Sequence, residues 1–469
     1  MQVKALHFAI FALMNQWNQW IAGLLPYTET AMLVLLLGGG LFLALYSRLK
    51  PYRYFKHAID ITRGKYDKEG ATGEVSHLQA LSAAIASTVG LGNISGVAIA
   101  VYLGGPGVIF WIWVVAVLGM AIKYYSCSLA VMFRGEDSNG VVQGGPMYYM
   151  TRGLGRLGSP LAVFYALMGM IGYLAIFQAN QFTQTFMVVV NPNENLIDLG
   201  GALPWKALIG VVLAAITATV IFGGVQKIAQ VATKIVGPMV GFYFIAVAVV
   251  LVMNADAILP SFGLILSEAF NFETAISGGL WGVIILGARR AMFSNEAGLG
   301  SAPMYHGQSK TDEPVQEGLV AMLGPFIDTI VVCTLTALVI LISGAHLEAE
   351  TNGILMTLIA FKKSLFGWGD VLLMIAVTSF ALSTILTYSY YGVKSLSFLT
   401  NARIAKGFNY FYILTIIVAA IASVDLVVNL MDLAYSLMLI PNMIAVLLLA
   451  PRVNRAAKDY FARYHSNQL

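Results

Sequence analysis

The sequence has few charged residues. Only 11% of its 469 residues are Asp, Glu, Lys or Arg, and 58% are hydrophobic, whereas a soluble domain carries about 25% charged residues. Segment after segment of about 20 residues has almost no charge, and this is the length that crosses about 30 Å of hydrocarbon. These proportions exclude a soluble domain and give no sign of a nucleic-acid partner. They predict an all-α integral membrane protein in a lipid bilayer.

Groups that several other classes of membrane protein use are also scarce. The two cysteines, Cys127 and Cys333, fall inside apolar segments and are expected to pack as small apolar residues. All six histidines lie outside the predicted spans or at their ends, so an intramembrane metal or haem centre has no histidine ligands. A phosphate-binding Gly-Lys-Ser/Thr motif is absent, which argues against an ATP-driven pump. We expect no enzyme and no cofactor, and the missing rings of charge argue against a channel.

The apolar segments divide into eleven predicted transmembrane helices. Basic residues gather in alternate loops, starting with the loop from Arg48 to Lys68, which the positive-inside rule places in the cytoplasm. The N-terminus is then outside and the C-terminus cytoplasmic, with few basic residues on the outer side: Lys4, Lys206, Lys362 and Lys363. The predicted spans are roughly 27–47, 78–103, 107–133, 160–190, 205–223, 228–253, 276–303, 318–343, 370–394, 408–424 and 430–450.

The order of the spans predicts an internal repeat. Residues 1–26 are expected to form an amphipathic outer-surface segment, 27–77 an extra helix with its basic loop, and 451–469 a basic cytoplasmic tail. The intervening ten helices form two sets of five, 78–253 and 276–450, which enter the membrane from opposite sides. Such inverted repeats place their substrate at the midplane, between the first helices of the two halves.

The first helix of the first half contains an unusual polar run. Residues 86–93 read Ala-Ser-Thr-Val-Gly-Leu-Gly-Asn, and backbone at this depth unwinds only where protein or a water-filled cavity satisfies its polar groups. A broken helix offers carbonyl groups beside free N–H groups, and so a cation site beside an anion site. For the second half, a count of half a span from its outer end predicts a break at Gly287-Ala288. Gly298-Leu299-Gly300 is interpreted as a helix-end turn or a coincidence.

Four motifs resemble one transporter family. Residues 89–93 are similar to the unwound first helix of symporters with the leucine-transporter fold. The runs Gly-Gly-Pro-Gly at 104–107 with Phe-Trp-Ile-Trp at 110–113, Gly-Gly-Pro-Met-Tyr-Tyr at 144–149, and Phe-Ser-Asn-Glu-Ala-Gly-Leu-Gly-Ser-Ala-Pro at 293–303 resemble the alanine/glycine:cation symporters of bacteria and archaea. One departure is Ser126, because the family often has an acidic residue three positions after the lysine that is Lys123 here.

The resemblance implies Na⁺-coupled or H⁺-coupled import of small neutral amino acids such as alanine or glycine across a bacterial or archaeal plasma membrane, by a ten-helix core with one extra N-terminal helix. H⁺ coupling or a preference for glutamine or serine in a transporter of the same fold are the alternatives, and a channel is a less favoured one. Concentrative uptake that responds to an imposed ion gradient distinguishes a symporter from a channel.

The amino acid is expected to bind at both breaks. The amides of Leu91 and Gly92 would bind its carboxylate, and the carbonyls of Thr88 and Gly287 its ammonium group. A glutamine inside a span must face protein or ligand, so Gln178 either contacts the substrate or forms an interhelical hydrogen bond. The aromatic residues Phe177 and Trp281 either limit the size of the substrate or pack against other residues. The candidate residues are Thr88, Leu91, Gly92, Phe177, Gln178, Trp281 and Gly287.

Na⁺ is a hard cation that prefers oxygen ligands. The resemblance implies a site made of the Ala86 and Val89 carbonyls with the Ser383 and Thr384 hydroxyls. Each hydroxyl has the alternative of bonding to a carbonyl of its own helix. We expect Na⁺ as the coupling ion, because the hydroxyl pair is the feature that favours Na⁺ over H⁺.

Asn93 and Asp328 are secondary candidates, because an acid inside a span is expensive and usually functional. Asp328 either approaches Asn93 and influences the cation site, couples protons, or pairs with Arg289 or Arg290, and we favour the pairing. Glu296 lies two turns after Arg289 and is assigned with it to a cytoplasmic gate network. These charged positions are the least determined by the sequence.

Overall fold

The computed structural model describes residues 2–190, 202–270, 279–348, 353–365 and 367–466. Within them, nine helices are long and apolar enough to cross a membrane, and one bent helix pair makes ten. The predicted span 276–303 corresponds to two shorter helices, α14 (Gly279–Asn295) and α15 (Ala302–His306), and residues 271–278 before them lie outside the described residues. The all-α membrane fold is confirmed, and the count of eleven stays a prediction.

The helices of the first part follow the predicted spans. A continuous helical run of α1 (Gln2–Leu33), η1 (Val34–Gly38) and α2 (Gly39–Tyr46) crosses residue 26 without a break. The short helices α3 (Lys50–Arg53) and α4 (Phe55–Thr62) follow. The next elements are α5 (His77–Thr88), η2 (Gly92–Gly96), α6 (Val97–Gly104), α7 (Val108–Met132), α8 (Pro146–Gly153), η3 (Gly155–Leu157), α9 (Gly158–Gly172), α10 (Ile176–Val190), α11 (Ala202–Ile221), α12 (Gly224–Met253) and α13 (Ala255–Glu268). A two-stranded hairpin of β1 (Gly135–Glu136) and β2 (Val142–Gln143) connects α7 to α8.

The second part of the chain, from α14 onward, is also built of helices. Its elements are α16 (Pro314–Pro325), η5 (Phe326–Cys333), α17 (Thr334–Ile342), η6 (Ala345–Leu347), α18 (Ile354–Ser364), α19 (Gly369–Leu399), α20 (Ala402–Ala405), α21 (Phe408–Ile421) and α22 (Val424–His465). The segments η2 and η5 are π-helical, a local widening that often marks functional sites.

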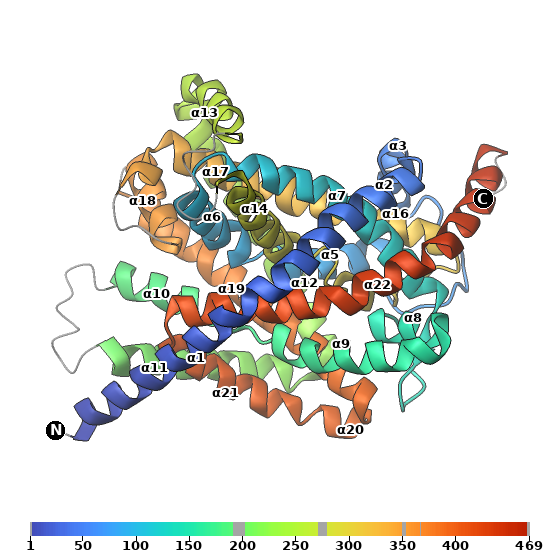
Figure 1. The fold of residues 1–469 in the computed structure, drawn as a ribbon, viewed down its shortest axis with the longest axis horizontal. Helices are drawn as coiled ribbons and strands as arrows, with labels where there is room; N and C mark the ends of the chain where they lie inside the picture. Colours follow the sequence, from blue (N-terminus) through green and yellow to red (C-terminus); the bar gives the residue numbers. More distant parts are fainter. Residues whose placement is uncertain (1, 191–201, 271–278, 349–352, 366, 467–469) are drawn as a thin grey trace.

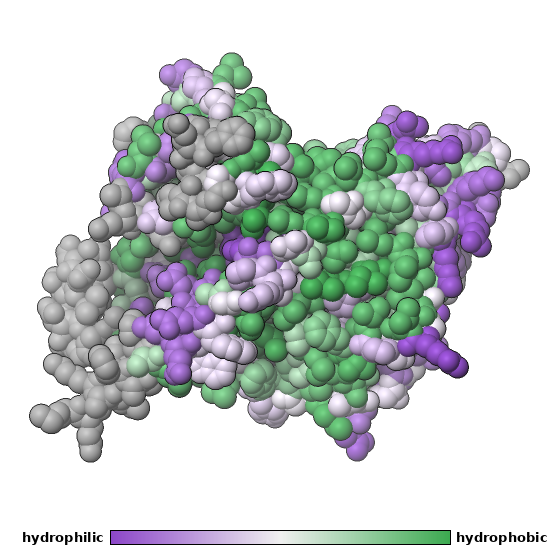
Figure 2. All heavy atoms as spheres, viewed as in Figure 1, coloured by the Kyte–Doolittle hydropathy of each residue, from purple (hydrophilic) through white to green (hydrophobic). Residues whose placement is uncertain are grey.

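Figure 1 shows how the long helices lie. The helices α1 and α22 run side by side across the middle of the view, and the chain termini lie at opposite ends of the molecule. Apolar side chains cover the middle of the face in Figure 2, and hydrophilic side chains gather at the end that carries α3 and the C-terminal part of α22. An apolar belt bounded by polar ends is the surface expected in a bilayer.

Prediction on backbone packing. A Cβ atom added to Gly144, next to β2, would lie 2.5 Å from Cα of Gly307, which follows α15. We therefore expect Gly144→Ala to destabilise the fold by about 1–3 kcal/mol through overpacking. The measurement is thermal unfolding of the purified protein. Gly38→Ala is the control, because nothing lies within 4 Å of its added Cβ, and equal melting temperatures for the two variants would contradict this packing.

Candidate functional site

The first break lies where the polar run predicts it. The helix α5 ends at Thr88, Val89 is extended with φ −70° and ψ 91°, and the two pieces of the bent pair differ in direction by 55°. The Gly90 N–H donates to Asn93 Oδ1 at 3.2 Å. Because this N–H would otherwise bond to the carbonyl four residues earlier, the Ala86 carbonyl is released from the helix.

The second break lies at residues 296–301, and the predicted break at Gly287-Ala288 is wrong. The helix α14 runs through Gly287 to Asn295, and left-handed backbone follows at Glu296 (φ 54°), Gly298 (φ 85°) and Gly300 (φ 85°). The Ala297 N–H donates to Asn295 Oδ1 at 2.8 Å. The Phe293 carbonyl therefore loses its helical hydrogen bond, as the Ala86 carbonyl does at the first break. The Gly-Leu-Gly repeat at 298–300, interpreted as a coincidence or helix-end turn, belongs to the break.

Gly287 has a packing role. A Cβ atom added there would lie 2.7 Å from Cβ of Trp111 on α7, so the missing side chain lets the two helices approach closely. Trp281 was expected near the substrate, but it lies at the start of α14 with 68% of its surface exposed. Gly287 therefore lies inside a continuous helix, so it does not release a carbonyl at a break as expected, and the role predicted for Trp281 stays a prediction.

The two broken helices lie antiparallel to each other, with their breaks side by side. The helix α5 contacts α15, and α6 contacts α14, so the piece before one break packs against the piece after the other. A Cβ atom added to Gly92 would lie 3.0 Å from the Phe293 ring and 3.2 Å from the Phe293 carbonyl oxygen. This antiparallel arrangement is the one that an inverted repeat produces.

Asp328 on η5 joins the two breaks. Asn93 Nδ2 donates to the Asp328 carbonyl at 2.8 Å and to its carboxylate, and Ser294 Oγ donates to the same carboxylate at 3.1 Å. The side chain is fully buried. Asp328 therefore approaches Asn93, one of the expected alternatives, and the favoured pairing with Arg289 or Arg290 is wrong.

The two arginines pair with other acids. Arg289 forms an ion pair with Glu29 of α1, and Arg290 forms a buried one with Asp432 of α22. Glu296 accepts a hydrogen bond from Tyr388 of α19, so the network assigned to Glu296 and Arg289 is also wrong. Asp432 was missed, although an acid inside a predicted span is the signal that singled out Asp328.

Of the predicted cation ligands, Thr384 lies directly at the first break. Its Oγ1 is buried without a hydrogen-bond partner among the described residues, and it lies against Gly90 where a Cβ would be. Ser383 Oγ instead donates to the Phe380 carbonyl of its own helix at 3.0 Å, which is the alternative considered for it. Ala86 and Val89 are buried at the end of α5 and beside it.

Most predicted substrate residues also gather here. Thr88, Leu91 and Gly92 are buried at the first break. The Phe177 ring packs against the Phe293 ring with centroids 4.5 Å apart. The neighbouring Gln178 is 2% exposed, and its amide oxygen has no partner among the described residues.

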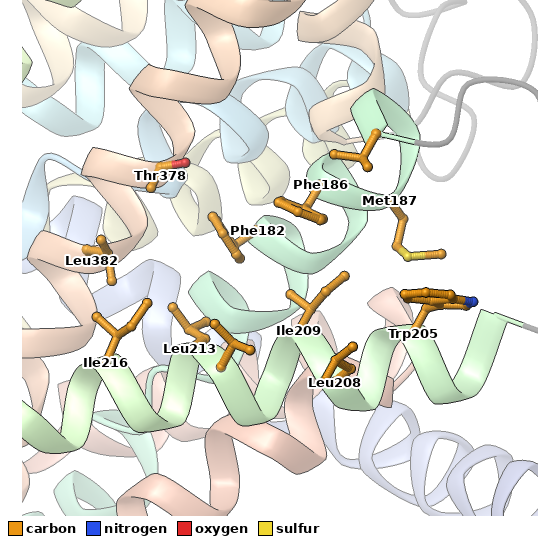
Figure 3. Close-up of a pocket in the computed structure, with 12 residues that line it drawn as sticks. Phe182, Phe186, Met187, Trp205, Leu208, Ile209, Leu213, Ile216, Thr378 and Leu382 are labelled. Atoms are coloured by element: carbon orange, nitrogen blue, oxygen red, sulfur yellow. The ribbon is translucent and has the colours of Figure 1, made fainter. Parts of the chain in front are cut away.

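An apolar cleft of about 330 Å³ lies away from the breaks, between α10, α11 and α19. Figure 3 shows Phe182, Phe186 and Ile209 pointing into it. Its hydroxyl group, on Thr378, donates to the Met374 carbonyl of the same helix. The cleft thus offers no free polar group to a zwitterion.

The sequence as a whole matches a known family. The model of the sodium:alanine symporter family matches residues 12–469. The chain belongs to the sodium:alanine symporter family. It is therefore a multi-pass membrane transporter, and the expected resemblance is confirmed.

Relatives of the transporter carry names with different substrates. It is 41% identical over 454 residues to the sodium/alanine symporter AgcS of Methanococcus maripaludis, covering 96% of this chain and 97% of that one. It is 34% identical to the probable sodium/glutamine symporter GlnT of Bacillus subtilis, covering 92% and 87%. The solved structure of MhsT in complex with L-phenylalanine has a TM-score of 0.58 at 16% identity, covering 82% of this chain and 98% of that one, a likeness in fold that confirms the leucine-transporter architecture.

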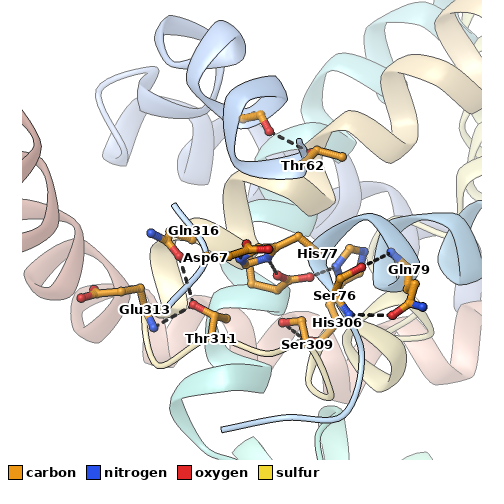
Figure 4. A network of polar contacts seen from close by, with 12 residues as sticks. Thr62, Asp67, Ser76, His77, Gln79, His306, Ser309, Thr311, Glu313 and Gln316 are labelled. Carbon is orange, nitrogen blue, oxygen red and sulfur yellow. Dashed lines mark hydrogen bonds and ion pairs between the residues drawn. The ribbon is translucent and has the colours of Figure 1, made fainter. Parts of the chain in front are cut away.

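A buried carboxylate holds the far ends of the two broken helices together. Glu317 of α16 contacts Nδ1 of His77, the first residue of α5. Its other carboxylate oxygen lies 2.5 Å from Nδ1 of His306, the last residue of α15. All three side chains are at most 2% exposed. Figure 4 shows His77 and His306 converging in this network. Sequence reasoning missed it, because histidines at span ends were used only to exclude metal centres.

Arg134 ties the same segments through their backbone. Its guanidinium donates to the carbonyls of Thr72, Gly307 and Thr311 at 3.0, 2.7 and 2.7 Å, and to that of Ser309. Burial lowers the pKa of Arg134, and the carboxylates of Glu317 and Asp312 oppose that shift. The segments before α5 and after α15 are thus fastened together at one end of the molecule.

Prediction on this fastening. We expect Glu317→Gln to destabilise the purified transporter by about 1–3 kcal/mol, because a neutral amide cannot accept hydrogen bonds from both histidines with both of its terminal atoms. Thermal unfolding in detergent measures the loss. Glu313→Gln is the matched control, since the pair of Glu313 with Arg463 is partly exposed and such pairs contribute about 0–1 kcal/mol. A smaller effect for Glu317→Gln than for the control would refute the role of the buried network.

Proposed function

We propose that the transporter imports small neutral amino acids together with Na⁺ by alternating access. We place it in the plasma membrane with its N-terminus outside and its C-terminus in the cytoplasm, as the distribution of basic residues favours. Family membership supports transport, and the relative named as a sodium/alanine symporter supports this ion and substrate. The observation that carries the proposal is the buried, unpaired hydroxyl of Thr384 at the first break.

Na⁺ would bind between α5 and α19. The Ala86 carbonyl is released from its helix, and it lies near the C-terminal end of α5, where the helix dipole is negative. With the Val89 carbonyl and the Thr384 hydroxyl, it offers the neutral oxygen ligands that a hard cation prefers. Ser383 would join this site by rotating its hydroxyl away from the Phe380 carbonyl.

The amino acid would bind across both breaks. Its carboxylate would meet the amides of Leu91 and Gly92, where the next helical piece begins. Its ammonium group would meet the released Phe293 carbonyl and the unpaired Gln178 oxygen, with the Thr88 carbonyl as a further acceptor. The packed rings of Phe177 and Phe293 would limit the side chain to a small size.

The ion pairs of the two arginines support a neutral substrate. Arg289 and Arg290 each have a carboxylate partner, so neither offers a free cation to a second substrate carboxylate. One observation favours H⁺ coupling as the second candidate. Asp328 is a buried acid that contacts both breaks, and no cation of the described residues lies within ion-pair distance of it.

Prediction on the coupling ion. Thr384→Val replaces the hydroxyl with a methyl group of similar size, so we expect the Na⁺ concentration for half-maximal uptake to rise at least tenfold, about 1.4 kcal/mol of lost Na⁺ binding. The measurement is alanine uptake into proteoliposomes against external Na⁺. Thr378→Val on the same helix is the control, because its hydroxyl bonds to Met374 beside the apolar cleft. An unchanged Na⁺ curve, or uptake driven by a proton gradient without Na⁺, would overturn the Na⁺ assignment.

Prediction on the substrate. We expect Gln178→Met to weaken alanine binding about 10-fold to 100-fold, because a hydrogen bond to a charged group contributes about 1.5–3 kcal/mol. Melting temperature should change little. Asn180→Leu should instead lower the melting temperature and leave alanine binding nearly unchanged. The reason is that the Asn180 amide donates to the Ala419 and Ala422 carbonyls at 2.9 Å and joins α10 to α21. Glycine and serine should compete with alanine and glutamate should not, so strong competition by glutamate would contradict the neutral-substrate proposal.

A further inference from the structure

A cavity of about 460 Å³ with both polar and apolar lining residues lies beside the C-terminal half of α19, and no residue of the two breaks lines it. Residues of the β1–β2 hairpin and of α21 complete its walls. Its volume is within the range of small-molecule sites. The side chains that matter for its chemistry are Lys394 and Tyr390 of α19, Asn409 of α21, and Glu74 and Asp137 near the rim.

A buried lysine, Lys394, lines this cavity. It is 7% exposed, and its Nζ donates to the Met304 carbonyl at 2.8 Å and lies 4.9 Å from the centroid of the Tyr390 ring. No carboxylate of the described residues lies within 4.0 Å of it, although Glu74 and Asp137 line the same cavity. An ammonium group has three N–H donors, and the structure gives one hydrogen bond. A buried cation in this state favours an anionic ligand.

A complementary acceptor lines the same cavity. The amide oxygen of Asn409 is buried without a hydrogen-bond partner among the described residues. Asp137 does not compete for this role, because its carboxylate accepts hydrogen bonds from Asn139, Val141 and Gln143 of its own hairpin. One cationic donor and one neutral acceptor in a single cavity match a carboxylate and an ammonium group, the two ends of a zwitterion.

The cavity lies directly behind the piece of helix that follows the second break. Lys394 is bonded to α15 through Met304, and the Tyr390 ring stacks on Tyr305 of α15 at 4.9 Å. The next residue, Tyr391, shares a hydrogen bond of 2.8 Å with Ser87 of α5. Tyr390 therefore lines the cavity and also contacts α15, while its neighbour Tyr391 contacts α5.

We propose that this cavity is a second binding site for the transported amino acid, on its way to the cytoplasm, in which Lys394 Nζ binds the carboxylate. The proposal rests on the proposed function. A carboxylate at Lys394 would accept hydrogen bonds from the two ammonium N–H groups that the Met304 carbonyl leaves free.

The first experiment measures exchange of labelled alanine in proteoliposomes. We expect Lys394→Met to raise the alanine concentration on the cytoplasmic side that gives half-maximal exchange at least tenfold, while the external value stays within twofold. Lys394→Arg should preserve the wild-type values, and so should Lys406→Met, which removes an exposed lysine from the rim of the same cavity. If the wild type does not transport alanine, the proposed function fails. If it does and Lys394→Met leaves the cytoplasmic value unchanged, only the second site fails.

The second experiment does not depend on how the Lys394 variants fold. Ser397→Cys places a thiol in the lining of the cavity. The native Cys127 and Cys333 do not line this cavity and are buried elsewhere. We expect alanine and propionate to slow its labelling by a thiol reagent in detergent, and propylamine to leave the rate unchanged. Protection by propionate without protection by alanine, or no protection by either, would overturn the proposal.

Discussion

The arrangement of the transporter depends on how its two helix breaks satisfy their polar groups inside an apolar molecule. An unpaired backbone group at this depth is expensive, and each break meets this cost with an asparagine. Asn93 takes the N–H of Gly90, and Asn295 takes the N–H of Ala297. In both cases one carbonyl, of Ala86 or of Phe293, is left without its helical donor. The carboxylate of Asp328 accepts hydrogen bonds from residues beside both breaks, so one side chain connects the two breaks.

The sequence allowed the first break to be predicted, because two glycines and several polar side chains stand inside an apolar span. The second break was placed about ten residues too early by counting along the span from residue 276. A count of this kind depends on where the helix enters the membrane. Trp281, near the start of α14, is exposed, so the first residues counted do not lie in the protein interior. The Gly-Leu-Gly pattern was the better indicator, since Gly298 and Gly300 both adopt the left-handed backbone that glycine favours. The backbone conformation that these glycines favour would have located the break, whereas the count along the span did not.

Charged residues were recognised as important, but their partners were not. Arg290 pairs with Asp432, which is 142 residues away in the chain, and Arg289 with Glu29 of the first helix. Every span contributes residues to the interior, so a buried arginine has several acids within its possible reach, and only the packing of α1 and α22 decides between them. The same limit applies to Glu317, whose two histidines come from different helices. Sequence spacing describes neighbours on one helix and does not describe contacts between helices.

The geometry of the first break gives a physical reason why two ligands would bind together. The released Ala86 carbonyl and the unpaired Thr384 hydroxyl lie on the α5 side, at the negative end of a helix dipole, and the amides of Leu91 and Gly92 lie on the other side, at the positive end of the next piece. In the proposed mechanism a cation satisfies the first set and a carboxylate the second. Either ligand alone would leave half of the break without partners. The cation and the carboxylate would also attract each other across the break, so each ligand would strengthen the binding of the other by the same factor.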